Sequence, residues 1–420
     1  MENIALISLI LAIVTGMLVT YFAVPVTIRV ARAKDLVDEP DKTRKLHSKS
    51  IPNLGGVAIF AGLLIGYSTW IGDVIPPYFP YLVTALVILF AVGIKDDIMV
   101  VSPRKKTLAQ IAASAILVIG GNVRLLHFDG FLGIHDGMPE VLAVAATIFA
   151  FMIIINAYNL VDGIDGLAAS MGIVSALLFG TWFFANGYMG DAILAGAFVG
   201  ALSGFLMYNK HPARIFMGDT GSLTIGLIMA MMAFRLIGLN PEATVMQLDT
   251  PTVFAFSLMI VPMFDTFRII IVRVLNKKSP MAADKRHLHH CLMNFDFGHR
   301  GICRVLVISS LAIAAVSYSI NHIDIHLYGF LVVAMGALIA PVAWLGKRIV
   351  RKLRAPKTCT LINSDAVEVL LHSCMHGLEN GAKSENGAES ENGAELESAE
   401  TDKRRACAPE QIEVLEYQKD

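Results

Sequence analysis

The chain has 420 residues, of which 55% are hydrophobic and only 16% are charged, and its formal net charge is −1. A soluble domain contains roughly 45–50% apolar and about 25% charged residues, so this composition excludes an ordinary soluble protein and indicates a membrane protein. The near-neutral charge gives no global reason to expect nucleic acid as a partner.

The apolar residues are gathered into separate runs, each close to the roughly 20 residues that a helix needs to cross a bilayer. These runs lie at 3–26, 54–72, 79–94, 107–123, 140–157, 167–185, 191–208, 222–239, 252–275, 304–320 and 327–345. The sequence therefore predicts an all-α polytopic membrane protein with about eleven transmembrane helices. The first run carries Glu2 where a signal peptide would be basic, so we expect it to be retained as a span.

Lysine and arginine are concentrated in alternate connections between these runs. They occur in the segments 29–49, 95–106, 210–214 and 277–300, whereas the segments 73–77, 186–190, 240–251 and 321–326 contain none. Because basic residues favour the cytoplasmic side, the N-terminus is predicted to lie outside and the C-terminus in the cytoplasm. All five cysteines then lie on the reducing side, where disulfides are not expected.

The sequence after the last run divides into two parts. Residues 346–378 begin with a basic stretch that is expected to lie against anionic headgroups of the inner leaflet. Residues 379–420 contain the repeats ENGAKS, ENGAES and ENGAEL and almost no aliphatic side chains, which is typical of a disordered tail. Three domains are therefore predicted, with residues 1–345 forming the transmembrane part.

Polar clusters occur on the basic side only. Asp96 and Asp97 are adjacent and are followed by Lys106, an arrangement that a divalent cation or a solvated loop would explain equally well. In NAYNLVDGIDGL, a three-residue spacing is expected to place four polar side chains on one face of a helix end, and these are Asn156, Asn159, Asp162 and Asp165.

A third cluster, NKHPARIFMGDTGS, follows the seventh run. Its Pro212 is expected to end one helix, and Asp219 to stand at the start of the next, where a helix N-terminus favours phosphate. Simple capping would explain Asp219 as well. The fourth cluster is DKRHLHH, with Arg286, His287, His289 and His290, which can bind phosphates or zinc.

The donors across these clusters are mainly carboxylates and amides surrounded by cationic groups. This mixture favours Mg²⁺ bound together with substrate phosphates, with Mn²⁺ as the second candidate, over zinc. Cationic side chains that neutralise a diphosphate are what phosphoryl transfer requires. The alternative class is a membrane transporter or lipid flippase, although the predicted spans are nearly free of acids.

The motifs KDD with a following PRKK, NxxNxxDGIDGL, NxxPAxxFMGDTGS and HLHH, in this order, resemble those of the polyprenyl-phosphate N-acetylhexosamine-1-phosphate transferases, which belong to glycosyltransferase family 4. The resemblance covers about residues 3–345, so residues 1–345 are expected to be the transmembrane catalytic domain. It implies transfer of a HexNAc-1-phosphate, with GlcNAc-1-phosphate first, from a UDP-sugar to undecaprenyl phosphate, with release of UMP. The muramoyl-pentapeptide variant of the reaction is disfavoured, because the histidine motif here reads HLHH, whereas the motif of that enzyme resembles HHH.

The resemblance also implies roles for individual positions. The catalytic positions are Asp96, Asp97, Asp162, Asp165, His287, His289 and His290. The substrate-binding positions are Lys49, Lys106, Asn209 and Arg286, and the metal ligands are Asp219 and Asn159. Asp96 is the preferred base that deprotonates the lipid phosphate. One departure is Val100, which stands where many relatives carry Asp, Asn or Lys, so no polar role can operate there.

The implied location is the bacterial inner membrane, with the active site facing the cytoplasm and a role in the first membrane step of a cell-envelope polysaccharide. The implied partners are a UDP-sugar, a polyprenyl phosphate and the bilayer. The sequence does not determine the oligomeric state, for which a homodimer is one candidate. A scaffold that recruits partners through the tail is a third class of function.

Overall fold

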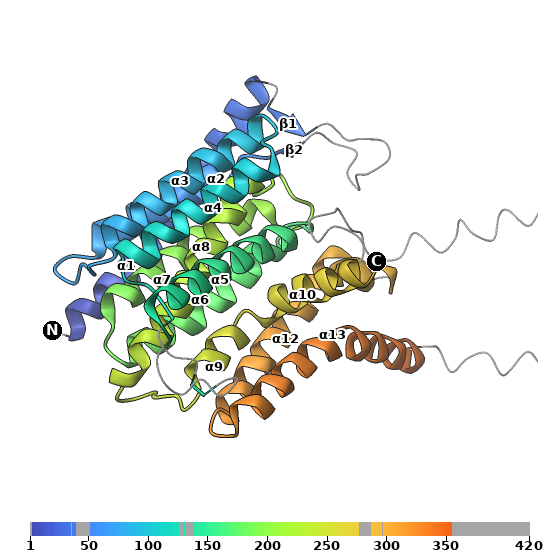
Figure 1. The fold of residues 1–420 in the computed structure, drawn as a ribbon. Helices are drawn as coiled ribbons and strands as arrows, with labels where there is room; N and C mark the ends of the chain where they lie inside the picture. Colours follow the sequence, from blue (N-terminus) through green and yellow to red (C-terminus); the bar gives the residue numbers. More distant parts are fainter. Residues whose placement is uncertain are drawn as a thin grey trace, which may run out of the picture. The chain divides into compact units, whose positions relative to one another are not determined.

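The computed structural model describes residues 2–34, 36–38, 51–125, 129–130, 138–276, 287–295 and 297–354. Within these residues the only strands are β1 (Val37–Asp38) and β2 (Ile51–Pro52), which pair antiparallel with Val37 opposite Pro52. The helices (Figure 1) are α1 (Glu2–Ala33), α2 (Gly55–Trp70), α3 (Phe79–Ile98), α4 (Pro103–Ala115), η1 (Ile116–Gly120), α5 (Glu140–Val161), α6 (Leu167–Ala185), α7 (Met189–Asn209), α8 (Gly218–Leu239), η3 (Asn240–Glu242), α9 (Pro251–Ser257), α10 (Ile260–Leu275), α11 (Leu288–Asn294), α12 (His299–Ser319) and α13 (Ile325–Arg354).

The helices confirm the predicted class, an all-α protein that passes through the membrane several times. Among the described residues, eight helices are long and apolar enough to span, and the pair α9 and α10, bent by 86°, would make a ninth. The other two apolar runs form shorter helices: α2 has 16 residues, and α4, with 13, continues into the π-helical η1. The count of eleven spans and the orientation of the chain remain predictions.

Helices α7 and α8 form the interior of the described bundle. In each of these helices, 83% of the residues in the most apolar stretch are buried by other parts of the protein, compared with 17% in α1 and in α13. Helix α7 packs against α1, α2 and α6, while α8 packs against α5, α3 and α2 (Figure 1). A helix that is apolar on every side is expected to take such a central place, whereas the apolar side chains exposed on α1 and α13 face outward.

Glycines allow three backbones to touch where α8 begins. A Cβ atom on Gly56 of α2 would overlap the backbone of Thr220 and Gly221, and one on Gly93 of α3 would lie 2.6 Å from the Thr220 Cα atom. Small residues at such crossings are the usual means by which membrane helices approach closely. The first turn of α8 is therefore enclosed between α2 and α3.

Backbone hydrogen bonds hold the chain that leads into α8. The Phe216 N–H donates to the Pro52 carbonyl (2.8 Å), and the N–H groups of Gly55 and Gly56 donate to the carbonyls of Phe216 (2.9 Å) and Met217 (2.8 Å). The segment before α8 thus runs beside the segment between β2 and α2. This pairing fixes the place at which α8 starts.

Helix α13 extends beyond the predicted boundary at residue 345. It continues to Arg354, because the basic stretch keeps helical propensity and contacts α11 and its neighbours. The Lys347 ammonium donates to the Phe295 carbonyl (2.8 Å) and lies 4.7 Å from the centre of the Phe297 ring. The predicted disordered tail, 379–420, and most of the segment 346–378 lie outside the described residues.

Candidate active site

Asp97 joins the last turn of α3 to the first turn of α8. One carboxylate oxygen accepts the Asp219 N–H (2.7 Å), and the other accepts the N–H (3.0 Å) and the hydroxyl (2.6 Å) of Thr220. The first N–H groups of a helix have no partner within the helix and carry partial positive charge, so a carboxylate stabilises them. The cap of α8 therefore comes from α3, and Asp219 itself, offered by the sequence as a capping residue, is left with its carboxylate directed elsewhere.

Gly218 is required where Asp97 meets α8. Its φ is +72°, and a Cβ atom there would lie 2.6 Å from both Asp97 carboxylate oxygens and 2.5 Å from the Asn53 carbonyl oxygen. We expect Gly218→Ala to lower the free energy of unfolding by about 1–3 kcal/mol, from the left-handed backbone and from displacement of Asp97.

The thermal unfolding midpoint of the purified protein measures this loss. The control is Gly238→Ala, in the last turn of the same helix, where a Cβ atom would meet no heavy atom within 4 Å. Equal midpoints for the two variants would contradict the assigned contact.

Asp219 lies at the centre of a cluster contributed by four helices. Its carboxylate accepts a hydrogen bond from the Asn159 amide of α5 (2.5 Å) and pairs with the Lys106 ammonium of α4. The same ammonium lies 3.3 Å from one carboxylate oxygen of Asp96, and the other Asp96 oxygen accepts the Val101 N–H (2.6 Å). One lysine thus neutralises two carboxylates that come from α3 and α8.

Asp162 follows the last residue of α5 and faces the same cluster. Burial, and after it the negative charges of Asp219, Asp97 and Asp165, raise the pKa of the Asp162 carboxyl well above its usual range. Carboxylates that raise one another's pKa in this way are stabilised by a cation between them. The hard oxygen donors of Asp162 and Asp219, with the Asn159 amide beside them, fit the ligand preference of Mg²⁺.

The predicted ladder of four polar side chains along one helix face is wrong in part. Helix α5 ends at Val161, and Gly166 (φ +76°) turns the chain before α6 starts. Asn156 pairs with Gln110 of α4 (3.0 Å), and the Asp165 carboxylate contacts His211 Nδ1 (2.7 Å). The three-residue spacing holds only while the chain is helical, and the DGIDG segment leaves the helix.

His287 lies against α10. Its Nδ1 is 3.0 Å from one carboxylate oxygen of Asp265, while the other accepts the Leu288 N–H (2.7 Å) and lies 3.1 Å from the Arg268 guanidinium. Asp265 and His287 are both buried. This carboxylate fixes the orientation of the imidazole and the start of α11.

The remaining predicted positions differ in what the structure describes. Asn209 is buried, accepts the Gly166 N–H (2.9 Å) and donates to the Ile215 carbonyl (2.9 Å), so its side chain joins two backbone segments. His290 is half-buried in the first turn of α11. The side chain of His289 and the whole of Lys49 and Arg286 lie outside the described residues.

Two residues of this region were missed by the sequence analysis. Asp265 is a lone acid within the apolar run 252–275, and such an acid is by default a candidate for function, which is the signal that could have identified it. Gln110 is buried between α4 and α5, one helical turn after Lys106, and its pairing with Asn156 holds these helices together. No spacing rule identifies a partner on another helix.

Comparisons with known proteins identify relatives of this chain. Residues 79–237 match the family model of glycosyl transferase family 4. A probable undecaprenyl-phosphate N-acetylglucosaminyl 1-phosphate transferase of Bacillus subtilis is 32% identical over 70% of this chain and 80% of its own length. A decaprenyl-phosphate N-acetylglucosaminephosphotransferase of Mycolicibacterium smegmatis is 30% identical over 68% of this chain and 75% of its own length.

The undecaprenyl-phosphate alpha-N-acetylglucosaminyl 1-phosphate transferase of Escherichia coli O157:H7 is 29% identical over 69% of this chain and 77% of its own length. The matched region of the family model contains Asp96, Asp97, Lys106, Asn159 and Asp219, whose side chains meet in the structure. The multi-pass helical fold, the polar cluster at the helix ends and these similarities lead to one conclusion: the chain belongs to glycosyl transferase family 4.

Proposed function

We propose that this protein transfers GlcNAc-1-phosphate from UDP-GlcNAc to a polyprenyl phosphate, undecaprenyl phosphate first, and releases UMP. The names of the relatives from Bacillus subtilis and Escherichia coli specify a GlcNAc-1-phosphate group and an undecaprenyl phosphate acceptor. The observation that carries the proposal is the meeting of Asp96, Asp97, Lys106, Asn159 and Asp219 at one place, from four helices.

Asp219, Asn159 and Asp162 would hold Mg²⁺, with Mn²⁺ as the alternative. When bound, the ion supplies charge stabilisation for the diphosphate and for the UMP leaving group. Asp219 is oriented for this role by Asn159, whose amide also donates to the Ser222 hydroxyl (2.8 Å). The Lys106 ammonium supplies positive charge beside the same carboxylate, where a substrate phosphate is attracted.

Asp96 is the group that takes the proton of the lipid phosphate. Both carboxylate oxygens of Asp97 accept hydrogen bonds from the N-terminus of α8, so we assign Asp97 to the positioning of Asp219. Asp96 is half-buried and is held by Lys106 and by the Val101 N–H. The freed phosphate oxygen attacks the β-phosphorus of the UDP-sugar, the bond to UMP breaks, and a sugar-diphospho-lipid remains.

The histidine segment is assigned to the diphosphate. The diphosphate is bound by Arg286, His287, His289 and His290. Asp265 orients His287. Lys49 contacts the nucleotide side. Asn209 acts indirectly, because both ends of its amide bind backbone groups. Asp165 is part of the same acidic region, because its negative charge is among those that raise the pKa of Asp162.

The proposed placement in the membrane has eleven spans, the N-terminus outside and the active site at the cytoplasmic face of the bacterial inner membrane. Lys106 and the other basic residues near the cluster support this side. The reaction would be the first membrane step in making a cell-envelope polysaccharide. A homodimer remains one candidate for the oligomeric state.

The experiment that tests the proposal uses purified protein in detergent with Mg²⁺, undecaprenyl phosphate and a panel of radiolabelled UDP-sugars. UMP release and label in the lipid should both appear with UDP-GlcNAc and depend on the divalent ion. Label from UDP-MurNAc-pentapeptide alone would indicate the muramoyl variant. Movement of lipid across vesicles without UMP release would identify a transporter or flippase and refute the proposal.

Removal of the tail after Arg354 is expected to leave the rate of transfer within about twofold of the full chain, because the assigned residues all precede it. The composition of residues 379–420 is typical of a disordered segment, and such a segment is not expected to supply catalytic groups. The rate of UMP release from the truncated and full chains, at equal amounts of folded protein, provides the measurement. Complete loss of activity would favour a scaffold function for the tail.

A further inference from the structure

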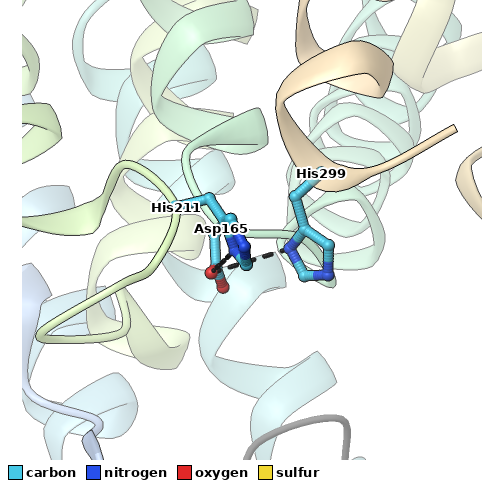
Figure 2. Close-up of side chains that lie close together, drawn as sticks. All are labelled: Asp165, His211 and His299. Atoms are coloured by element: carbon cyan, nitrogen blue, oxygen red, sulfur yellow. Dashed lines mark hydrogen bonds and ion pairs between the residues drawn. The ribbon is translucent and has the colours of Figure 1, made fainter. Parts of the chain in front are cut away.

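Three side chains of types that can ligate a metal meet outside the Asp219 cluster (Figure 2). Asp165 comes from the turn between α5 and α6, His211 from the segment between α7 and α8, and His299 from the first residue of α12. One Asp165 carboxylate oxygen lies 2.7 Å from His211 Nδ1 and 3.6 Å from His299 Nδ1. The three ligand atoms, one from each residue, all lie within 4.8 Å of one another. Among the described parts of the chain, no other group of three His, Cys, Asp or Glu residues comes this close together.

The chemistry of this set differs from that of the Asp219 cluster. Two imidazoles and one carboxylate are typical ligands of Zn²⁺ and of similar transition metals, whereas Mg²⁺ prefers oxygen donors only. The two rings lie close to each other, with their centres 4.5 Å apart and an angle of 35° between their planes. Both present Nδ1 to the same carboxylate, as Figure 2 shows.

The distances suit a tetrahedral ion. Ligands at 2.0–2.1 Å from zinc in tetrahedral geometry are about 3.3 Å from one another. The two oxygen–nitrogen distances, 2.7 Å and 3.6 Å, lie on either side of that value, so the first would lengthen by about 0.6 Å and the second shorten by about 0.3 Å when zinc binds.

Burial leaves one side of the set open to solvent. The Asp165 side chain is 2% exposed and that of His299 is 12% exposed, while that of His211 is 38% exposed. A set of three protein ligands with an open side can take water as a fourth ligand. An ion can therefore reach the site without unfolding of the surrounding helices.

The backbone around the three residues is held by other hydrogen bonds. The Ala213 N–H donates to the Asp165 carboxylate (3.2 Å), and the Arg300 guanidinium donates to the His211 carbonyl (3.2 and 3.0 Å). The Cys303 thiol, one helical turn after His299, lies 3.4 Å from the Asp165 carbonyl oxygen. Such support keeps the ligands in place, and preorganised ligands lose little conformational entropy on binding.

We propose that Asp165, His211 and His299 bind one Zn²⁺ ion, at a site separate from the Mg²⁺ of the transfer reaction. The ion links the start of α12 to the turn that follows Asp162 and to the segment that leads into α8. Its binding stabilises the folded protein in proportion to the logarithm of the zinc concentration above Kd. The proposal does not depend on the proposed function, because its test needs no turnover.

The test measures zinc bound to the purified full chain in saturating Mg²⁺, which occupies oxygen-donor sites. After removal of free metal, the wild-type protein should retain one equivalent more zinc than His299→Ala or His211→Ala. Zinc should raise the thermal midpoint of the wild type, and the apparent Kd should weaken at least tenfold in both variants. Zinc held by the HLHH segment is common to all of these proteins and cancels in the comparison.

The matched control is His326→Ala. His326 Nδ1 lies 3.7 Å from an Asp324 carboxylate oxygen, and both side chains are exposed, at 53% and 66%. This variant should bind zinc as the wild type does. If the alanine variants do not fold, His299→Gln keeps the side-chain bulk without the imidazole, and Co²⁺ in the wild-type chain should give the visible absorption of a tetrahedral nitrogen-containing site.

Equal zinc content and equal midpoints in the wild type, His299→Ala and His211→Ala would overturn the proposal. So would a wild-type chain that binds no zinc in Mg²⁺ buffer or gives only an octahedral Co²⁺ spectrum. Zinc binding with no UMP release would refute the transferase activity alone, and UMP release with no zinc binding would refute this site alone.

Discussion

Asp219→Asn is expected to reduce the rate of UMP release by about 10³-fold or more while the protein remains folded. The carboxylate of Asp219 pairs with Lys106, accepts from Asn159 and is assigned to the metal. Asparagine keeps the size of the side chain but removes the charge that a divalent ion needs. Initial rates with UDP-GlcNAc and undecaprenyl phosphate at saturating Mg²⁺ give the measurement.

The control for this variant is Asp324→Asn. Asp324 is exposed between α12 and α13, and its carboxylate accepts the N–H groups of His326 (3.0 Å) and Leu327 (3.1 Å). The Asp324→Asn variant should lower the free energy of unfolding slightly and leave the rate of UMP release near that of the wild type. Retention of normal UMP release by folded Asp219→Asn would refute the assignment of the metal to Asp219.

Arg235→Met is expected to lower the free energy of unfolding by about 3–5 kcal/mol, because it leaves the buried Asp191 carboxylate without its partner. The Arg235 guanidinium makes two hydrogen bonds of 2.9 Å to that carboxylate, which also accepts the Tyr78 hydroxyl (2.8 Å). Asp191 lies in the first turn of α7, and Arg235 lies near the end of α8, about 24 Å along the helix from Asp219 at 1.5 Å per residue.

Chemical unfolding in detergent measures this loss, and Arg124→Met is the control. Arg124 pairs with Glu140 (2.6 Å), but the Glu140 side chain is 75% exposed, so this pair should contribute only about 0–1 kcal/mol. The double variant Asp191→Leu with Arg235→Met should be less destabilised than Arg235→Met alone, since no charge is left buried. Similar losses for Arg235→Met and Arg124→Met would contradict the inferred importance of burial.

Composition and the spacing of apolar runs predicted the helical membrane class because lipid imposes a simple rule on the chain. Each span must close its own hydrogen bonds, so every run had to become a helix, and α3, α5 and α8 lie where their runs were placed. The bend between α9 and α10 was not predictable in the same way. Both halves of the run 252–275 are apolar, and although Pro262 is a signal for a break in a helix, it does not specify an 86° change of direction.

The residues near Asp219 were predictable as polar groups at helix ends, but their partners were not. Asp96 and Asp97 are adjacent and chemically identical, yet one pairs with Lys106 and the other caps α8. That division depends on where α8 begins, which is fixed by contacts with β2 and α2 far away in the sequence. The periodicity argument failed for Asp165 because it assumed that the helix continues to that residue, whereas α5 ends at Val161.

The crossing at Gly56, Gly93 and Gly221 limits how this protein can diversify. Backbone touches backbone there, so almost any substitution would push the start of α8 away from its neighbours. Variation that alters which sugar nucleotide is accepted must therefore arise elsewhere, in side chains that surround the crossing. A mutational library aimed at new donor specificity should spare these three glycines and sample the connecting segments instead.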